Sequence, residues 1–112
     1  MSENYSVRYS PMAMDDLRAI YTYIAEHLQV SETAKKQVNR IRETIRSLDT
    51  MPSRYALVDW EPWRHIGMHK VAVDHYVVYY VVNSDRLTVQ IIRIFYGGRD
   101  AEAILQSETN KE

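Results

Sequence analysis

Apolar positions in the first part of the chain follow a strand period and then a helix period. Tyr5, Val7 and Tyr9 alternate with polar residues, which is the period-two pattern of a half-buried strand. Ser10 then supplies an N-cap, and Pro11 suits the first turn of a helix. The apolar stripe that follows, at spacings of three and four, consists of Ala13, Leu17, Ile20, Ile24 and Leu28. The pattern predicts one short strand followed by an amphipathic helix.

A second helix is predicted directly after the first. Ser31 is a candidate N-cap, and the helical spacing of apolar residues resumes behind it. Its stripe consists of Ala34, Val38, Ile41, Ile45 and Leu48. Pro52 forbids continuation, because a proline inside a helix removes a hydrogen bond and clashes with the preceding turn. Two amphipathic helices with a tight connection predict an antiparallel helical hairpin.

Three further apolar runs predict a sheet in the C-terminal half. Residues 50–62 lose periodicity but carry several aromatic side chains, so we expect an ordered loop that is pinned to the body. The runs at 65–73, 76–82 and 87–96 are separated by polar turns and are predicted strands. The middle run is almost continuously apolar, which predicts a central strand buried on both faces.

The predicted order of elements is β-α-α-β-β-β. It indicates an α+β fold in which the helical hairpin packs on one face of a mainly antiparallel, twisted sheet. The other sheet face, or a groove at the sheet edge, is then open to partners. Residues 1–100 form one expected domain, and 101–112 are expected to add a short helical turn, with 107–112 as a disordered acidic tail.

Composition narrows the class of protein. The 112 residues fit a single domain, and 14 basic against 15 acidic side chains give a net charge of -1. No global positive field therefore attracts nucleic acid or an anionic membrane. The absence of cysteine excludes disulfides and thiolate chemistry. No apolar run approaches the roughly 20 residues that span a bilayer, and no signal peptide is recognisable, so we expect a cytoplasmic protein without a membrane partner.

Three histidines lie close together in the sequence but do not predict a metal site. His65 and His69 are separated by about 13 Å if they lie four residues apart on one strand, and His75 falls in the following turn. The chain also lacks the G-x-S-x-G turn that presents a nucleophilic serine. We expect no metal and no cofactor.

Basic residues gather in two places. Those on the second predicted helix are Lys35, Lys36, Arg40, Arg42 and Arg46. They fit a solvated helix exterior, and a nucleic-acid face is the alternative. Those on the predicted sheet are Arg64, Lys70, Arg93 and Arg99, with His75 nearby. Strand alternation places Arg93 on one face with Ile91 and Phe95, so its charge is expected to border a sheet surface. Together with the other basic residues of the predicted sheet, it could bind phosphates or an acidic protein.

Three stretches of the chain are informative together. They read S-P-M-A-M-D-D-L-R-A-I-Y at the first predicted helix, R-H-I-G-M-H-K-V-A-V-D-H-Y-V-V-Y-Y-V-V across two predicted strands, and I-I-R-I-F-Y-G-G-R-D at the last strand. In this order they resemble the RelE/ParE superfamily of bacterial toxins over about residues 5–100. The resemblance implies a toxin encoded beside an antitoxin, neutralised when an antitoxin segment wraps it in a toxin–antitoxin hetero-oligomer.

One branch that the resemblance suggests is the ribosome-dependent mRNA endonucleases. Their chemistry needs a base, a general acid and charge stabilisation at the scissile phosphate. By resemblance, Lys70 serves as charge stabiliser, Tyr96 as general acid/base and Arg99 as phosphate clamp. Further candidates for contact with a target or a phosphate are Arg64, His75 and Arg93. The chain departs from that branch where arginine and another basic residue are expected, because it has Val77 and Gly97.

The other branch is the ParE-like inhibitors of DNA gyrase, a protein–protein activity that needs no catalytic set. The Arg99-Asp100 pair and the incomplete basic cluster favour this branch. We therefore carry two hypotheses, a gyrase inhibitor and an mRNA endonuclease acting at the ribosome, with preference for the first. A degenerate toxin that only binds antitoxin is the third alternative.

Overall fold

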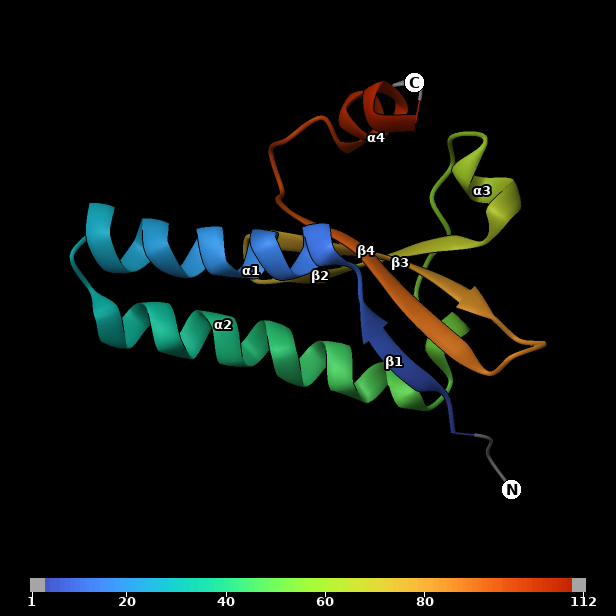
Figure 1. The fold of residues 1–112 in the computed structure, drawn as a ribbon, viewed down its shortest axis with the longest axis horizontal. Helices are drawn as coiled ribbons and strands as arrows, with labels where there is room; N and C mark the ends of the chain where they lie inside the picture. Colours follow the sequence, from blue (N-terminus) through green and yellow to red (C-terminus); the bar gives the residue numbers. More distant parts are fainter. Residues whose placement is uncertain (1–3, 110–112) are drawn as a thin grey trace.

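The computed structural model describes residues 4–109 and places a helical hairpin on one side of a four-stranded sheet (Figure 1). Two short helices, α3 and α4, lie on the other side. The elements are β1 (Ser6–Tyr9), α1 (Pro11–Thr22), a π-helical turn (Tyr23–His27), α2 (Ser31–Arg46), α3 (Trp63–Ile66), β2 (Met68–Val73), β3 (Tyr76–Asn83), β4 (Thr88–Tyr96) and α4 (Ala101–Thr109). The predicted α+β class and the order of the main elements are confirmed.

The start of α1 agrees with its sequence signals. The Ala13 N–H donates to the Ser10 hydroxyl oxygen at 3.0 Å, and the Ser10 hydroxyl donates to the Ile92 carbonyl at 2.8 Å. The cap therefore also ties the helix to β4. The predicted cap of α2 is wrong, because Ser31 is already the first helical residue and Val30 precedes it without a side-chain cap.

The hairpin and the sheet enclose the larger core. It contains the buried residues Ala13, Leu17, Ile20, Ile24, Ala34, Ile41, Ile45, Leu48, Val71, Val73, Val78, Tyr80, Val89, Ile91 and Ile94. Leu28 was predicted to continue the α1 stripe but is 55% exposed. The reason is the π-helical turn, in which the Leu28 N–H donates to the Tyr23 carbonyl five residues back at 3.3 Å. The wider turn shifts the helical phase and carries Leu28 off the stripe.

The sheet has the strand order β1-β4-β3-β2, with β1 parallel to β4 and the other pairs antiparallel. β3 is thus an interior strand, and its Tyr80 faces the hairpin core while Tyr79 faces the second core, as its apolar run predicted. The β3–β4 register shifts between Tyr79 and Tyr80, which pair with Arg93 and Ile91. This bulge separates Ile91 from Arg93, so the prediction that they share a face is wrong.

The second sheet face is largely covered, so the first of the two predicted alternatives, an open sheet face, is wrong. Its buried cluster consists of Val58, Met68, Tyr79, Phe95, Ala101 and Leu105. These residues come from the 50–62 loop, the sheet and α4. The loop is pinned as predicted, because Val58 is fully buried and the Tyr80 hydroxyl donates to the Pro52 carbonyl at 2.7 Å.

Two element boundaries differ from prediction. Residues 65 and 66 were predicted to begin a strand but belong to α3, and Gly67, with a φ of 96°, ends that helical turn in the left-handed region. β2 therefore begins at Met68. At the C-terminus α4 extends through Thr109, so Ser107 is helical rather than disordered, and residues 110–112 of the predicted tail lie outside the described residues. Among residues 4–109, no helix is long and apolar enough to cross a membrane.

Candidate functional site

A groove of about 650 Å³ lies between the end of the helical hairpin where α1 connects to α2 and the sheet, at the start of β3 and the end of β4. We call it the hairpin groove. Its apolar wall comes from the α1–α2 region and includes Ile20, Tyr23, Ile24 and Leu28. Its other side chains come from the sheet and the segment after β4, and include His75, Tyr76, Arg93, Tyr96 and Arg99. It thus combines exposed apolar surface with aromatic and cationic groups.

Tyr96 and its neighbours form an aromatic cluster at this groove. The Tyr96 ring is 5.7 Å from the Tyr76 ring in an edge-on arrangement and 6.4 Å from the His75 ring. Tyr96 is 56% exposed and Tyr23 is 53% exposed. Burial, with smaller contributions from Tyr96 and Tyr23, raises the pKa of Tyr76, so its hydroxyl stays protonated at neutral pH and is not a general base.

Arg99 supplies an unmatched positive charge. It lies in the connection between β4 and α4, where its backbone N–H donates to the Tyr96 carbonyl at 3.0 Å. The guanidinium carbon stands 5.6 Å from the Phe95 ring centroid, which holds the side chain by a cation–π contact. None of the ion pairs within residues 4–109 involves Arg99. Its charge is available to a partner.

Arg93 lies in the same groove wall, but its charge is already matched. Its Nε and a terminal nitrogen donate to the two Asp16 carboxylate oxygens at 2.8 and 3.0 Å, and another terminal nitrogen pairs with Glu108. The Asp16 hydrogen bonds are the main cause that raises the pKa of Arg93, against the effect of burial. The residue ties α1 and α4 to β4, so it stabilises the groove rather than offering a free cation.

Lys70 and Arg64 lie away from the groove. Lys70 pairs with Tyr79 across β2 and β3 and projects on the α4 side of the sheet, whereas Tyr96 lines the groove on the hairpin side. Arg64 belongs to α3 and donates to the Val58 carbonyl at 3.2 Å. The structure therefore brings together four of the six sequence candidates, which are His75, Arg93, Tyr96 and Arg99.

The apolar wall was missed by the sequence reasoning. Leu28 was assigned to an apolar stripe that packs inward, and the π-helical turn that shifts it off this stripe leaves no motif in the sequence. The pairing of Asp16 with Arg93 was also missed, because the two residues lie 77 positions apart in the sequence. The described residues contain no group of three metal-ligating side chains.

A family comparison decides the class of this protein. The family described as "ParE toxin of type II toxin-antitoxin system, parDE" matches residues 7–101. The chain belongs to the ParE toxin family. This ParE-family chain is a toxin of a type II toxin–antitoxin module, with a ParE/RelE-like fold.

Solved structures support the same fold for the ParE-family toxin. A chain of the chromosomal ParDE toxin–antitoxin system of P. aeruginosa matches with 25% identity and a TM-score of 0.67, over 82% of this chain and 95% of that one. A chain of the RelBE2 toxin–antitoxin complex of Mycobacterium tuberculosis has 20% identity and a TM-score of 0.61, over 83% and 98%. The free E. coli RelE toxin, as a mutant, has 12% identity and a TM-score of 0.66, over 97% and 99%. No curated protein sequence matches the chain.

Proposed function

We propose that this toxin inhibits DNA gyrase and is not a ribosome-dependent nuclease. The observation that carries the proposal is the separation of Lys70 from Tyr96 by the sheet. General acid–base chemistry needs its groups within hydrogen-bond reach of one reacting centre. Two side chains on opposite sheet faces do not meet that requirement. The family match to ParE and the similarity to a ParDE system chain point the same way.

The hairpin groove is suited to a protein target. Exposed aromatic residues and arginine are enriched at the energetic centres of protein–protein interfaces. The groove offers Tyr23 and Tyr96 beside Leu28, with the unmatched charge of Arg99 at the same surface. We infer that Arg99 anchors a carboxylate of gyrase while the aromatic residues bury apolar surface around it. His75 lies beside Tyr96 and extends this contact surface.

The partner that neutralises the toxin is a cognate antitoxin. Similar solved chains belong to toxin–antitoxin systems, among them ParDE of P. aeruginosa and RelBE2 of M. tuberculosis. We propose that the antitoxin of this module covers the hairpin groove, because a toxin whose apolar wall and Arg99 are buried has no surface left for its target. A toxin that is monodisperse alone and binds no product of the neighbouring gene would contradict this proposal.

Metabolic labelling tests the proposed target. The chain is induced without an antitoxin in a tightly regulated host, and pulse-labelled DNA and protein synthesis are followed from the first minutes. We expect DNA synthesis to fall first, with an induced damage response. An early loss of protein synthesis with cleaved transcripts would establish the endonuclease instead. Normal growth with confirmed soluble protein would indicate a degenerate toxin.

A further inference from the structure

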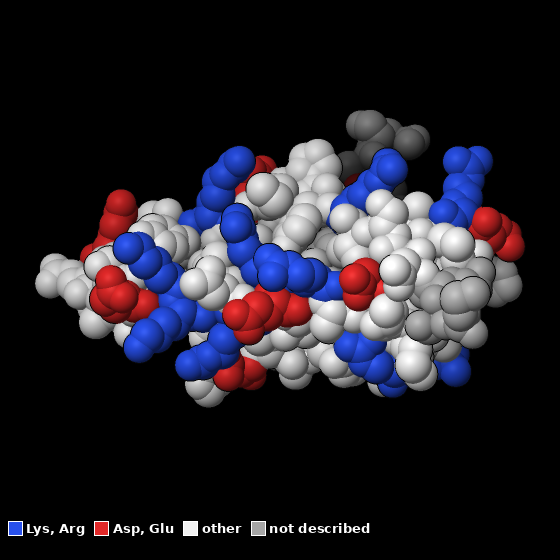
Figure 2. Space-filling view, turned by 90° about the horizontal axis from the view of Figure 1, so that it is seen from below, with Lys and Arg blue, Asp and Glu red and all other residues white. Residues whose placement is uncertain are grey.

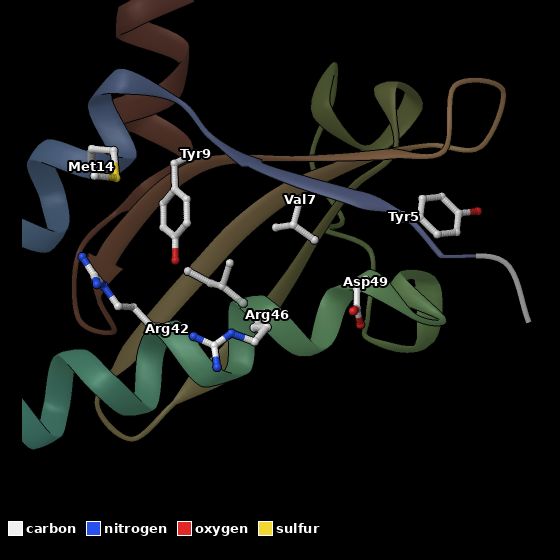
Figure 3. Close-up of a pocket in the computed structure, with 8 residues that line it drawn as sticks. Tyr5, Val7, Tyr9, Met14, Arg42, Arg46 and Asp49 are labelled. Carbon is white, nitrogen blue, oxygen red and sulfur yellow. The ribbon is translucent and has the colours of Figure 1, made fainter.

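A second hollow, of about 450 Å³, lies between the edge strand β1 and the C-terminal half of α2 (Figure 3). We call it the β1 pocket. Val7 and Tyr9 line it from β1, and Arg42 and Arg46 line it from α2. Figure 3 shows the Tyr9 side chain directed from the strand toward α2, where the two arginine side chains lie. The pocket therefore combines a phenol hydroxyl with two guanidinium groups.

The two arginines of this pocket carry unmatched charge. Arg42 and Arg46 are four residues apart on one helix, so their side chains are neighbours and repel each other weakly. Two other basic residues of α2 are paired, because Lys35 contacts Glu32 and Arg40 contacts Asp74. No ion pair within residues 4–109 involves Arg42 or Arg46. Both arginines act electrostatically on Tyr9, where burial raises the pKa and their charges oppose that rise.

The sheet edge beside this pocket is open. The Ser6 and Ser10 N–H groups donate toward the β4 side, to the Leu87 and Ile91 carbonyls at 2.9 Å each. By the alternation of a strand, the N–H groups of Val7 and Tyr9 point away from β4, and they have no hydrogen-bond partner within residues 4–109.

The opposite sheet edge differs, because the 50–62 loop covers it. There the Val58 N–H donates to the Met68 carbonyl and the Lys70 N–H to the Ala56 carbonyl, each at 3.0 Å. An exposed strand edge with unpaired backbone groups is a template for another extended chain. β1 is thus the edge strand that can pair with an extended segment of another chain.

We propose that the β1 pocket binds an extended acidic segment of a partner protein. The segment pairs with β1 through its backbone and directs a carboxylate between Arg42 and Arg46, within reach of the Tyr9 hydroxyl. Val7, Met14 and Ile45 supply apolar contact between the charges. Asp49 lies toward the start of β1 and disfavours a second carboxylate there. The segment is therefore acidic at the Tyr9 end and neutral or basic at the Asp49 end.

A peptide fits this surface better than a nucleic acid does. Figure 2 views the molecule from the α2 side and shows Lys and Arg side chains interspersed with carboxylates rather than joined in one basic band. The net charge of the chain is -1, whereas backbone phosphates are bound by concentrated positive charge. Unpaired backbone N–H groups on an edge strand also match the carbonyls of an extended peptide. The assignment goes beyond gyrase inhibition, since it concerns a different surface.

An NMR titration of the ¹⁵N-labelled full chain tests the assignment. The probe is a blocked peptide of about seven residues, a usual strand length, with glutamate at alternate positions of one half and threonine at all other positions. We expect the Val7 and Tyr9 amide signals to shift most. Replacing Arg42→Gln together with Arg46→Gln should weaken binding about tenfold or more. The matched control, Lys35→Gln together with Lys36→Gln, removes the same charge from the same helix outside the pocket and should leave binding within about twofold.

Four outcomes overturn the assignment. The first is equal binding of a peptide with glutamine in place of glutamate, which would remove the role of the carboxylate. The second is an equal loss in both double variants, which would indicate nonspecific charge attraction. The third is binding of an oligouridine but not of the acidic peptide, which would indicate a phosphate site. The fourth is a shift confined to residues other than β1. Well-dispersed spectra of every variant confirm that the comparisons are made on folded protein.

Discussion

The two faces of the sheet are held in different ways. On the hairpin face, two helices bury a continuous aliphatic core that includes Ile41 and Ile45, each at most 1% exposed. On the other face, the short helix α4 covers a smaller cluster around Phe95 and is tied to β4 by the Arg93–Glu108 ion pair. Because the hairpin face buries the larger apolar core, it contributes most of the free energy of folding. The interaction surfaces lie where the hairpin coverage ends.

The largest expected loss of stability is on the hairpin face. Ile41→Ala removes a fully buried side chain and leaves a cavity, which should lower the free energy of unfolding by about 4 kcal/mol. Urea unfolding followed by circular dichroism measures the change. A loss below about 1 kcal/mol would mean that the core relaxes around the site, and the contrast between the faces would fail.

The second effect concerns Arg93, whose ion pairs tie both α1 and α4 to β4. Arg93→Gln removes the guanidinium from the Asp16 carboxylate, which keeps the hydrogen bond from the Ile94 N–H, and the Arg93 and Asp16 side chains are only 13% and 14% exposed. We expect a loss of about 2 kcal/mol, below that of a fully buried pair. Arg18→Gln is the control, because the exposed Arg18–Asp15 pair should contribute less than about 0.5 kcal/mol. Equal effects in the two variants would show that the Arg93 network does not secure these helices.

Adjacent tyrosines on β3 provide a smaller and cleaner comparison. Tyr80→Phe removes the buried hydrogen bond to the Pro52 carbonyl and should cost about 1 kcal/mol. Tyr79→Phe should be close to neutral, because the Tyr79 hydroxyl has no hydrogen bond within residues 4–109. Thermal unfolding at neutral pH measures both variants. The reverse order of effects would contradict the account of how the loop is pinned.

The same tyrosine predicts the alkaline limit of stability. Burial raises the pKa of Tyr80, so the folded chain holds this proton more tightly than the unfolded chain. The resulting stability is complete below the ordinary tyrosine pKa of about 10 and is lost as pH rises above it. We expect the wild type to lose stability more steeply above that pH than Tyr80→Phe does. Parallel curves for the two proteins would show that Tyr80 does not drive the loss.

The smallest stability effect should accompany the largest functional one. Arg99→Gln removes an exposed cation that has no ion pair within residues 4–109, so the free energy of unfolding should change by less than about 0.5 kcal/mol. Toxicity on induction should nevertheless be lost, because this charge is proposed to contact gyrase. Colony counts at matched soluble expression check the prediction, and retained toxicity would remove Arg99 from the contact surface.

The order of elements was predictable because periodicity reports directly on burial. The stripes of both helices and the continuous run of β3 each follow from one local pattern, and apart from Leu28 these residues pack in the core as predicted. The prediction of Ser31 as an N-cap was wrong because a favourable residue type alone does not determine at which residue the helix begins. Gly67 ends a helical turn instead of lying in the predicted strand. Its left-handed backbone conformation could not be recognised from the pattern of apolar residues.

The candidate site was predictable only in part, because it depends on contacts between distant segments. Tyr96 and Arg99 were named through the family resemblance, and His75 through its nearness in sequence to the basic residues of the sheet. The bulge in β4 was not predictable, and it moved Arg93 away from the face of Ile91. That Lys70 and Tyr96 lie on opposite faces of the sheet could be seen only in the structure. A resemblance in sequence does not tell on which face of a sheet a side chain lies.

Gyrase itself provides the most direct test of the central claim. Purified gyrase is assayed for supercoiling of relaxed plasmid in the presence of the purified toxin, with Arg99→Gln and Lys70→Gln as paired variants. The account predicts inhibition by the wild type and by Lys70→Gln, which lies outside the groove, and none by Arg99→Gln. Full gyrase activity beside the wild-type toxin, with transcript cleavage on ribosomes that depends on Lys70, would contradict it.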